Sequence, residues 1–400
     1  MRLLIVAMAN SIHTARWLSQ IADRGWDIHL FPSTDSFLDV HPEIGGVTLH
    51  HTGWRRRGPN AHGVAFRGVS LRRRAEEVFR RRFLDRPDPE AAARRLARVI
   101  AATRPDIVHS MEIQHAGYLA FAARRLLGGA FPPWIVTNWG SDIYLFGRLA
   151  EHEPRIREVL GACDYYSCEC RRDVCLAKEY GLKGKVLPVF PNTGGFDLAD
   201  AARLRRPGPV SARRTIVLKG YQHWAGRALV GLRALARCAD ALSGYEVAVY
   251  SATPDVAVAA ELMGKETGIP VRIVPKETPH RGILALHGQA RISIGLSISD
   301  AISTSLLEAI VMGSFPVQSW TACADEWVED GVTGLLVPPE DPEAIEGALR
   351  RALADDGLVD RAAGENGRLA AERLDRSVLK PLAAGLYTTV AGERGIRDGA

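Results

Sequence analysis

Several features that define large protein classes are missing from this sequence. No run of apolar residues approaches the roughly 20 that a membrane-spanning helix needs, and the short apolar stretch at residues 3–8 reads as a buried first strand. The Gly-x-Gly-x-x-Gly pattern that binds dinucleotides in dehydrogenases does not follow that strand. No Asp-x-Asp element suited to a divalent cation stands out either. These absences argue against a membrane-spanning protein and a dehydrogenase.

Cysteine is scarce, and its spacing matches no familiar site. Four of the six cysteines crowd together: Cys163, Cys168, Cys170 and Cys175. A zinc site would typically use paired Cys-x2-Cys spacing, which is absent, and so few cysteines in 400 residues make no disulfide framework. We therefore expect packed, reduced thiols without a metal, which fits a cytoplasmic protein.

Charge is modest in total but uneven along the chain. The net charge is +5, whereas residues 55–104 contain 15 arginines and only five acids. Within this Arg-rich segment, residues 71–84 have the apolar stripe of an amphipathic helix. The arginines indicate either a solvated face or peripheral contact with an anionic surface such as the inner membrane. Nucleic acid is not expected, because no aromatic residues interleave as stacking platforms.

The order of predicted elements indicates two domains. Buried strands alternate with amphipathic helices, which is typical of parallel sheets covered on both faces, and 400 residues exceed one ordinary core. Residues 197–214 carry Pro and Gly without apolar periodicity and predict a linker. We expect an N-terminal domain over 1–197, a C-terminal domain over 212–377, and a final helix within 378–400 that packs back on the first domain.

Both domains are predicted to be doubly wound α/β folds of the Rossmann-like type. The predicted strands are 3–8, 27–31, 106–110, 134–137, 165–169, 185–189, 215–218, 245–250, 271–274, 292–296, 315–318 and 335–337. The clearest predicted helices are 14–24, 90–103, 116–127, 303–312 and 340–354. Such sheets bind ligands at the carboxyl ends of their strands, so we expect the two domains to face each other across a cleft.

The most informative stretch is residues 297–317, where a buried strand ends and a helix begins near Ser303. The first N–H groups of a helix have no partner within it, so those of Ser303 and Thr304 form an anion site suited to a diphosphate. Asp300 and Glu308 fall in the loop and on the helix, and carboxylates accept hydrogen bonds from sugar and ribose hydroxyls. Taken alone, an N-cap aspartate and an exposed helical glutamate explain the pattern equally well.

This stretch resembles the acid-x7-acid signature of retaining glycosyltransferases of family 4, which have the GT-B fold. Residues 324–337 resemble the E-h-h-x-x-G-x-x-G-h-L-V segment of that family, where h is hydrophobic. Upstream, residues 105–109 and 191–197 resemble its P-D-h-V-H and P-N-G-h-D elements. The resemblance covers nearly the whole chain, and it implies an acceptor-side N-terminal domain and a donor-binding C-terminal domain.

The resemblance also implies roles at the donor site. Glu308 would bind the ribose hydroxyls of the donor nucleotide. Asp300 stands where the family usually has glutamate, and it would hold hydroxyls of the transferred sugar and take part in catalysis. Ser303 and Thr304 would offer backbone N–H groups to the diphosphate.

The family's basic pair after the first strand of the second domain is altered here. The common pattern is G-R-x4-K-G, whereas this chain has Tyr221 in place of the arginine and Arg227 one position after the expected lysine. A guanidinium grips phosphate through two hydrogen bonds, so we expect Arg227 to bind the diphosphate and assist catalysis, with Lys219 as the second candidate. A strand-end lysine and a surface arginine are the alternative interpretation.

On the acceptor side, the turn after the first strand contains Asn10, Ser11 and His13. A strand-to-helix turn of a parallel sheet lies at the ligand-binding edge. Ser11 is best explained as a helix cap. We expect Asn10 and His13 to contact the acceptor or a phosphate, and His13 to take part in catalysis.

Residues 136–143 resemble the family's T-x-H-G-x-D element, with Trp139 in place of the histidine. Tryptophan stacks on sugar faces but cannot act as a base. Asp142 is expected to orient an acceptor hydroxyl or to serve as a weak base. His109, at the end of its strand, is a further candidate for contact with acceptor or sugar, although histidines in such places are more often buried or solvated.

As a whole, the resemblance implies a hexosyltransferase-like glycosyltransferase (EC 2.4) that uses a nucleotide-diphosphate-sugar donor. The acceptor would be a glycan, a lipid-linked molecule or a small molecule. Transfer would retain the anomeric configuration by front-face substitution, with no metal or other cofactor, and an oxygen of the leaving diphosphate would help to deprotonate the acceptor. Two alternatives stay open: a nucleotide-sugar epimerase and a non-catalytic nucleotide-sugar-binding protein.

Overall fold

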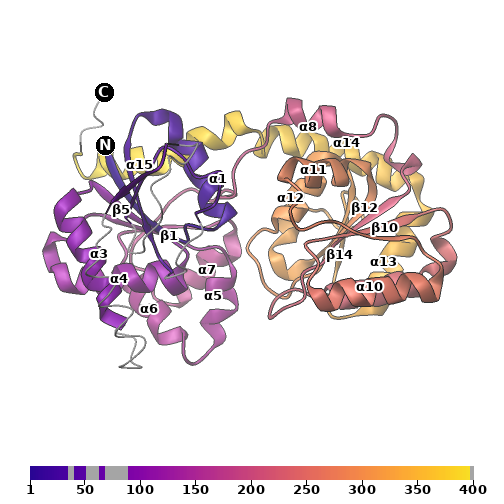
Figure 1. Ribbon diagram of the computed structural model, residues 1–400, viewed down its shortest axis with the longest axis horizontal. Helices are drawn as coiled ribbons and strands as arrows, with labels where there is room; N and C mark the ends of the chain where they lie inside the picture. Colours follow the sequence, from indigo (N-terminus) through magenta and orange to yellow (C-terminus); the bar gives the residue numbers. More distant parts are fainter. Residues whose placement is uncertain (35–39, 51–62, 68–88, 397–400) are drawn as a thin grey trace. The chain divides into compact units, whose positions relative to one another are not determined.

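The computed structural model describes residues 1–34, 40–50, 63–67 and 89–396 and divides into two compact units. Unit 1 comprises Met1–Gly194 and Leu379–Ala400, and unit 2 comprises Gly195–Val378. Each unit is a parallel sheet with helices against its two faces (Figure 1). The prediction of two Rossmann-like α/β domains is therefore confirmed at the level of the fold class.

The sheet of unit 1 has eight parallel strands in the order β4-β3-β2-β1-β5-β6-β7-β8. Its strands are β1 (Arg2–Ala7), β2 (Asp27–Pro32), β3 (Thr48–His50), β4 (Ala65–Arg67), β5 (Ile107–Met111), β6 (Trp134–Thr137), β7 (Tyr165–Ser167) and β8 (Lys185–Val186). Leu3 of β1 lies opposite Ile28 on one side and Ile107 on the other. The chain therefore winds outward from β1 and then resumes at β5, which makes the β1–β5 boundary the topological switch point of this unit.

The helices of unit 1 follow its strands in the crossover positions. They are α1 (Ile12–Ile21), η1 (Ala22–Arg24), α3 (Pro89–Thr103), the π-helix η2 (Ile113–Gly117), α4 (Tyr118–Leu127), η3 (Gly128–Ala130), α5 (Ser141–Tyr144), η4 (Phe146–Arg148), α6 (Glu153–Ala162) and α7 (Arg171–Glu179).

Unit 2 repeats the architecture with a six-stranded parallel sheet in the order β11-β10-β9-β12-β13-β14. Its strands are β9 (Thr215–Lys219), β10 (Glu246–Tyr250), β11 (Val271–Ile273), β12 (Ala290–Gly295), β13 (Phe315–Ser319) and β14 (Leu335–Val337). Ile216 of β9 lies between Val247 of β10 and Ile292 of β12. The switch point of this unit is therefore the β9–β12 boundary.

The helices of unit 2 include two elements within the predicted linker, α8 and η5. They are α8 (Leu198–Leu204), η5 (Val210–Ala212), α9 (Ala228–Arg237), η6 (Ala239–Ala241), α10 (Pro254–Thr267), α11 (His280–Gln289), α12 (Thr304–Met312), η7 (Trp320–Ala322), η8 (Ala324–Glu326), α13 (Pro342–Ala354) and α14 (Asp356–Arg373).

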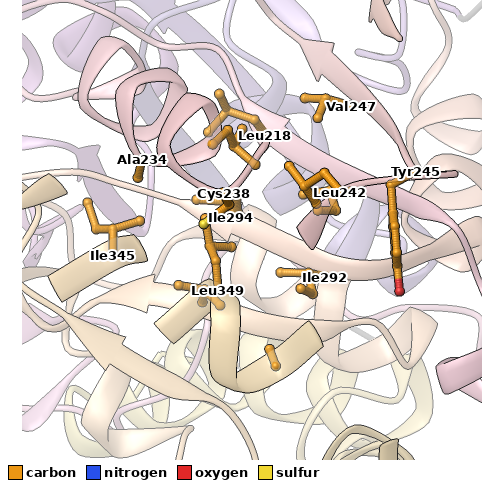
Figure 2. Close-up of a cluster of buried hydrophobic side chains, with 14 of the residues drawn as sticks. Leu218, Ala234, Cys238, Leu242, Tyr245, Val247, Ile292, Ile294, Ile345 and Leu349 are labelled. Carbon is orange, nitrogen blue, oxygen red and sulfur yellow. The ribbon is translucent and has the colours of Figure 1, made fainter. Parts of the chain in front are cut away.

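The core of unit 2 explains why its strands read as continuous apolar runs. Leu218 and Ile294 are buried on one face of the sheet, in the cluster of Figure 2 that also contains Ala234 of α9 and Leu349 of α13. Val217, which points to the other face, is buried in a second cluster. A parallel sheet has no solvated face, so its inner strands do not alternate between polar and apolar residues.

The last helix, α15 (Arg376–Glu393), completes the core of unit 1. Leu379, Leu386 and Val390 are buried in the same cluster as Leu3 and Ile5 of β1. Tyr387 accepts a hydrogen bond from the indole N–H of Trp17 at 2.8 Å. Residues more than 350 positions apart therefore share one core.

Three expectations about local structure need correction or fall outside the described residues. Residues 197–214 are not a structureless linker, because they form α8 and η5 and belong to unit 2. The strand predicted at 165–169 ends at Ser167, so Cys168 follows it, and all six thiols are free. The predicted helix at 71–84, and most of the Arg-rich segment, lie outside the described residues.

Among the described residues, no helix combines the length and apolar character needed to cross a membrane.

Candidate functional site

The loops that follow β9 and β12 meet at the switch point of unit 2. Gly226, after β9, forms a bridge with Ser297, after β12, and the N–H of Arg227 donates to the carbonyl of Leu296 at 3.1 Å. The turn requires glycine at 226, because a Cβ there would lie 2.3 Å from the carbonyl oxygen of Tyr221. This close packing joins two segments that the sequence separates by 70 residues.

Helix α12 begins at this edge of the sheet with small residues. Ser303 is its N-cap, and the carbonyl of Ser303 accepts from the N–H groups of Leu306 and Leu307. The Ser303 hydroxyl bonds the Ser305 hydroxyl at 2.7 Å instead of capping the backbone. Helix geometry leaves the first N–H groups without intrahelical partners, and a helix start at a switch point is a favourable position for an anion.

Glu308, on the second turn of α12, is a buried carboxylate with only 5% of its surface exposed. Its Oε1 lies 2.8 Å from Nε2 of His280, and its Oε2 lies 3.6 Å from Nε2 of His287. Both histidines belong to α11. Burial lowers the pKa of His287 to about 4, so this ring is neutral near pH 7, and its Nδ1 lies 2.8 Å from the Ser293 hydroxyl.

Asp300 lies in the loop between β12 and α12 and is half-buried. Its Oδ1 accepts a hydrogen bond from the N–H of Ala301 at 3.0 Å. The structure therefore places Asp300 in the loop and Glu308 on the helix, one on each side of the α12 N-terminus.

Arg227 and Lys219, the two candidate phosphate ligands, differ in their contacts with the rest of the protein. The Arg227 guanidinium bonds Glu340 at 2.8 Å and the carbonyls of His223 and Gly226 at 3.2 and 2.9 Å. These contacts hold the Arg227 side chain across the β9–α9 turn, and its role as a diphosphate ligand stays a prediction. The Lys219 ammonium sits 4.6 Å from the centre of the Tyr221 ring, and no carboxylate of the described chain pairs with it.

At the switch point of unit 1, the structure brings His13 and Trp139 together. Their rings lie 5.3 Å apart at an angle of 49°. Ser11 caps α1 by accepting from the N–H of His13 at 3.2 Å, and Asn10 is exposed in the preceding turn. His13 and Trp139 therefore form an aromatic pair that joins the first turn of α1 to the loop after β6.

Asp142 does not have the geometry of an acceptor base. It is only 4% exposed, and its two oxygens accept from the N–H groups of Trp139 at 2.8 Å and Ile113 at 3.1 Å. Burial, together with the nearby carboxylates of Glu112 and Asp173, holds the pKa of Asp142 well above its ordinary value. Its position indicates that it ties the Trp139 loop to η2.

His109 also departs from its expected role. The ring is fully buried, with Nδ1 2.7 Å from the Tyr387 hydroxyl and Nε2 2.6 Å from the Thr137 hydroxyl. Burial lowers its pKa to about 3. Because both ring nitrogens are engaged in the core, contact with an acceptor or sugar does not fit this geometry.

Two features of these edges were not predicted. His280 and His287 stand seven residues apart, which places them on one face of α11, and that spacing was the available signal. Glu112 follows β5 with a φ of 80°, and its carboxylate accepts from the N–H groups of His115 and Ala116 and contacts His115 Nδ1 at 3.2 Å. The backbone strain at Glu112 has no sequence signature.

Comparisons with known families match both halves of the chain. The model described as glycosyl transferase 4-like matches residues 79–162, and the model described as glycosyl transferases group 1 matches residues 262–370. The second match contains Asp300, Ser303 and Glu308. No curated protein sequence gives a significant match.

Several solved structures share the fold over almost their full length. Sucrose-phosphate synthase from Thermosynechococcus elongatus is 16% identical with a TM-score of 0.69, covering 98% of this chain and 100% of its own. The α,α-trehalose 6-phosphate synthase from Burkholderia multivorans is 16% identical with a TM-score of 0.69, covering 100% and 98%. HepE from Anabaena, solved with UDP, is 14% identical with a TM-score of 0.66, covering 98% and 100%. Identities this low are evidence for a common GT-B fold.

Proposed function

We propose that the chain, which has the GT-B fold and matches the model of glycosyl transferases group 1 over residues 262–370, is a glycosyltransferase that transfers a sugar from a UDP-sugar donor. Transfer would proceed with retention of configuration and without a metal. The acceptor is a glycan, a lipid-linked molecule or a small molecule. The proposal of UDP draws on HepE from Anabaena, whose structures contain UDP and UDP-glucose.

The observation that carries the proposal is the arrangement around α12. The start of α12 lies between a half-buried carboxylate, Asp300, and a buried one, Glu308, at the switch point of the sheet. A nucleotide sugar has the matching sequence of groups: ribose hydroxyls, a diphosphate and sugar hydroxyls. In this assignment Glu308 accepts from the ribose, the N–H groups of Ser303 and Thr304 bind the diphosphate, and Asp300 accepts from the sugar.

The chemistry of front-face substitution suits these residues. The bond between the anomeric carbon and the diphosphate oxygen breaks, and its electron pair leaves with UDP. The acceptor oxygen bonds the anomeric carbon from the same face, and its proton passes to the departing phosphate oxygen. The developing negative charge is stabilised by the α12 N-terminus and Lys219.

A binding and turnover experiment tests this function. Purified protein is titrated with UDP, GDP, ADP and dTDP with and without EDTA, and UDP-glucose consumption is followed by NMR. We expect UDP to bind more tightly than the other three nucleotides, also in the presence of EDTA. We expect Glu308→Ala to keep the fold and to lower turnover at least 100-fold, since a group that contacts the donor is lost. Full activity of Glu308→Ala would contradict the assigned donor site.

A further inference from the structure

The carboxylate assigned to the ribose is held by an imidazole from a neighbouring helix. His280 lies in the first turn of α11, its ring is 31% exposed, and its Nε2 is 2.8 Å from Oε1 of Glu308. The second histidine of that helix face, His287, is buried beneath it and approaches the other oxygen at 3.6 Å. Two turns of one helix therefore present two imidazoles to one buried carboxylate.

The surroundings make His280 the contact that faces solvent. From β10 and β9 the titratable groups near Glu308 and His287 are Tyr250, which is buried, and Lys219. From α8, Asp200 pairs with Arg281. Arg205, which follows α8, donates to the carbonyl of Val311. The helix α14 contributes only uncharged buried side chains.

A carboxylate can accept about four hydrogen bonds, two at each oxygen. The donor at Oε1 fixes the rotamer of Glu308. The orientation of Glu308 therefore depends on the group that donates to it.

We propose that His280 is a positioning residue for nucleotide recognition, which holds Glu308 in the orientation that accepts the ribose hydroxyls. This inference rests on the donor site proposed above. His287 cannot take over the role, because its Nε2 lies beyond hydrogen-bond distance and its ring is kept in place by Ser293. His280 thus acts through Glu308 and is specific for the ribose part of the donor.

Nucleotide probes that differ only in the ribose test the proposal. Calorimetric titrations compare UDP with 2′,3′-dideoxy-UDP for the wild type, His280→Ala and His280→Gln. We expect His280→Ala to weaken UDP binding about tenfold, the loss typical of a hydrogen bond to a charged group, and to leave dideoxy-UDP binding unchanged. His280→Gln, whose amide can donate in the same direction, should recover part of the UDP affinity.

Two further variants separate positioning from general structural damage. In a Glu308→Gln background, His280→Ala should have no additional effect on UDP binding, since the two residues act as one unit. His152→Ala, which removes a half-buried histidine bonded to Tyr118 in unit 1, should leave UDP binding unchanged. Equal losses for UDP and dideoxy-UDP, or no loss for UDP, would overturn the proposal. If the wild type binds neither probe, the donor site itself is wrong, which is a different outcome.

Discussion

The two units have the same architecture, but they differ in the side chains that lie at the helix start beside the switch point. In unit 1, carboxylates of the chain itself accept from the backbone N–H groups at the switch point. Glu112 accepts from N–H groups in the first turn of η2, and Asp142 accepts from the N–H groups of Ile113 and Trp139. In unit 2, the corresponding helix start at α12 has a serine N-cap whose hydroxyl turns to another serine.

The difference teaches where an anion can bind. A helix start that already bonds a buried carboxylate has neither free N–H groups nor a favourable field for a phosphate. A start built from serine and threonine keeps both. The side chains at the carboxyl edge of a sheet therefore decide whether a helix start there can bind an anion.

The strongest test of this comparison introduces a carboxylate into unit 2. In Ser303→Asp, a negative charge would sit at the start of α12, as it does in unit 1, and would repel a diphosphate. We expect UDP affinity to fall about tenfold or more, measured by calorimetry. Ser11→Asp places the same charge at the capped start of α1 and should leave UDP affinity unchanged; a similar loss in both variants would refute the assignment of the anion site to α12.

The second test concerns the polar centre of each core. Tyr387→Phe in unit 1 removes the hydroxyl that bonds Trp17 and His109, which leaves buried polar atoms without a partner and should cost about 1–3 kcal/mol. Tyr245→Phe in unit 2 removes only a 3.4 Å contact with Arg214 and should cost less than about 0.5 kcal/mol. Thermal unfolding measures both, and equal shifts would contradict the polar anchoring of α15.

The third test uses one fully buried histidine from each unit, His109 and His287. The folded pKa of His109 is about 3 and that of His287 about 4, below the unfolded value of 6.5. Their contribution to stability is therefore fully present above pH 6.5 and is lost as pH falls towards the folded pKa, by at most about 1.4 kcal/mol per pH unit for each histidine. Replacing either with glutamine should flatten the loss of melting temperature between pH 6.5 and 4.5, and an unchanged slope would show that the ring is not buried.

The smallest effect is expected at the two helix caps. Ser11→Ala removes a side chain that accepts from the backbone and should cost about 1 kcal/mol. Ser303→Ala removes a hydroxyl that does not cap its helix and should cost less. Comparing the melting temperatures of the two variants tests whether α12 starts without a side-chain cap.

Local patterns predicted much of the fold, because each buried strand and each helix start leaves a mark in neighbouring residues. The helix that carries Glu308 was predicted within one residue of its start, since its N-cap, apolar stripe and terminal Gly313 are all local signals. The helix α8 was missed because it has only seven residues and because Pro207, Gly208 and Pro209 follow it closely. Its stability comes from packing in unit 2.

Side-chain roles were harder to predict where they depend on distant partners. The burial of His109 depends on Tyr387, which is 278 residues away, and the engagement of Arg227 depends on Glu340. The contact between His280 and Glu308 depends on how α11 packs against α12. Sequence spacing identifies which residue types are available, whereas the packing of separate elements decides which of them reach solvent.

The placement of α15 has a consequence for the order in which the protein is made. Unit 1 takes its first 194 residues from the beginning of the chain, but its core also needs Leu386 and Val390. During synthesis the ribosome supplies all of unit 2 before these residues emerge. The domain begun first is therefore the last that can be completed, and until then its nascent core has an apolar face with no helix to cover it.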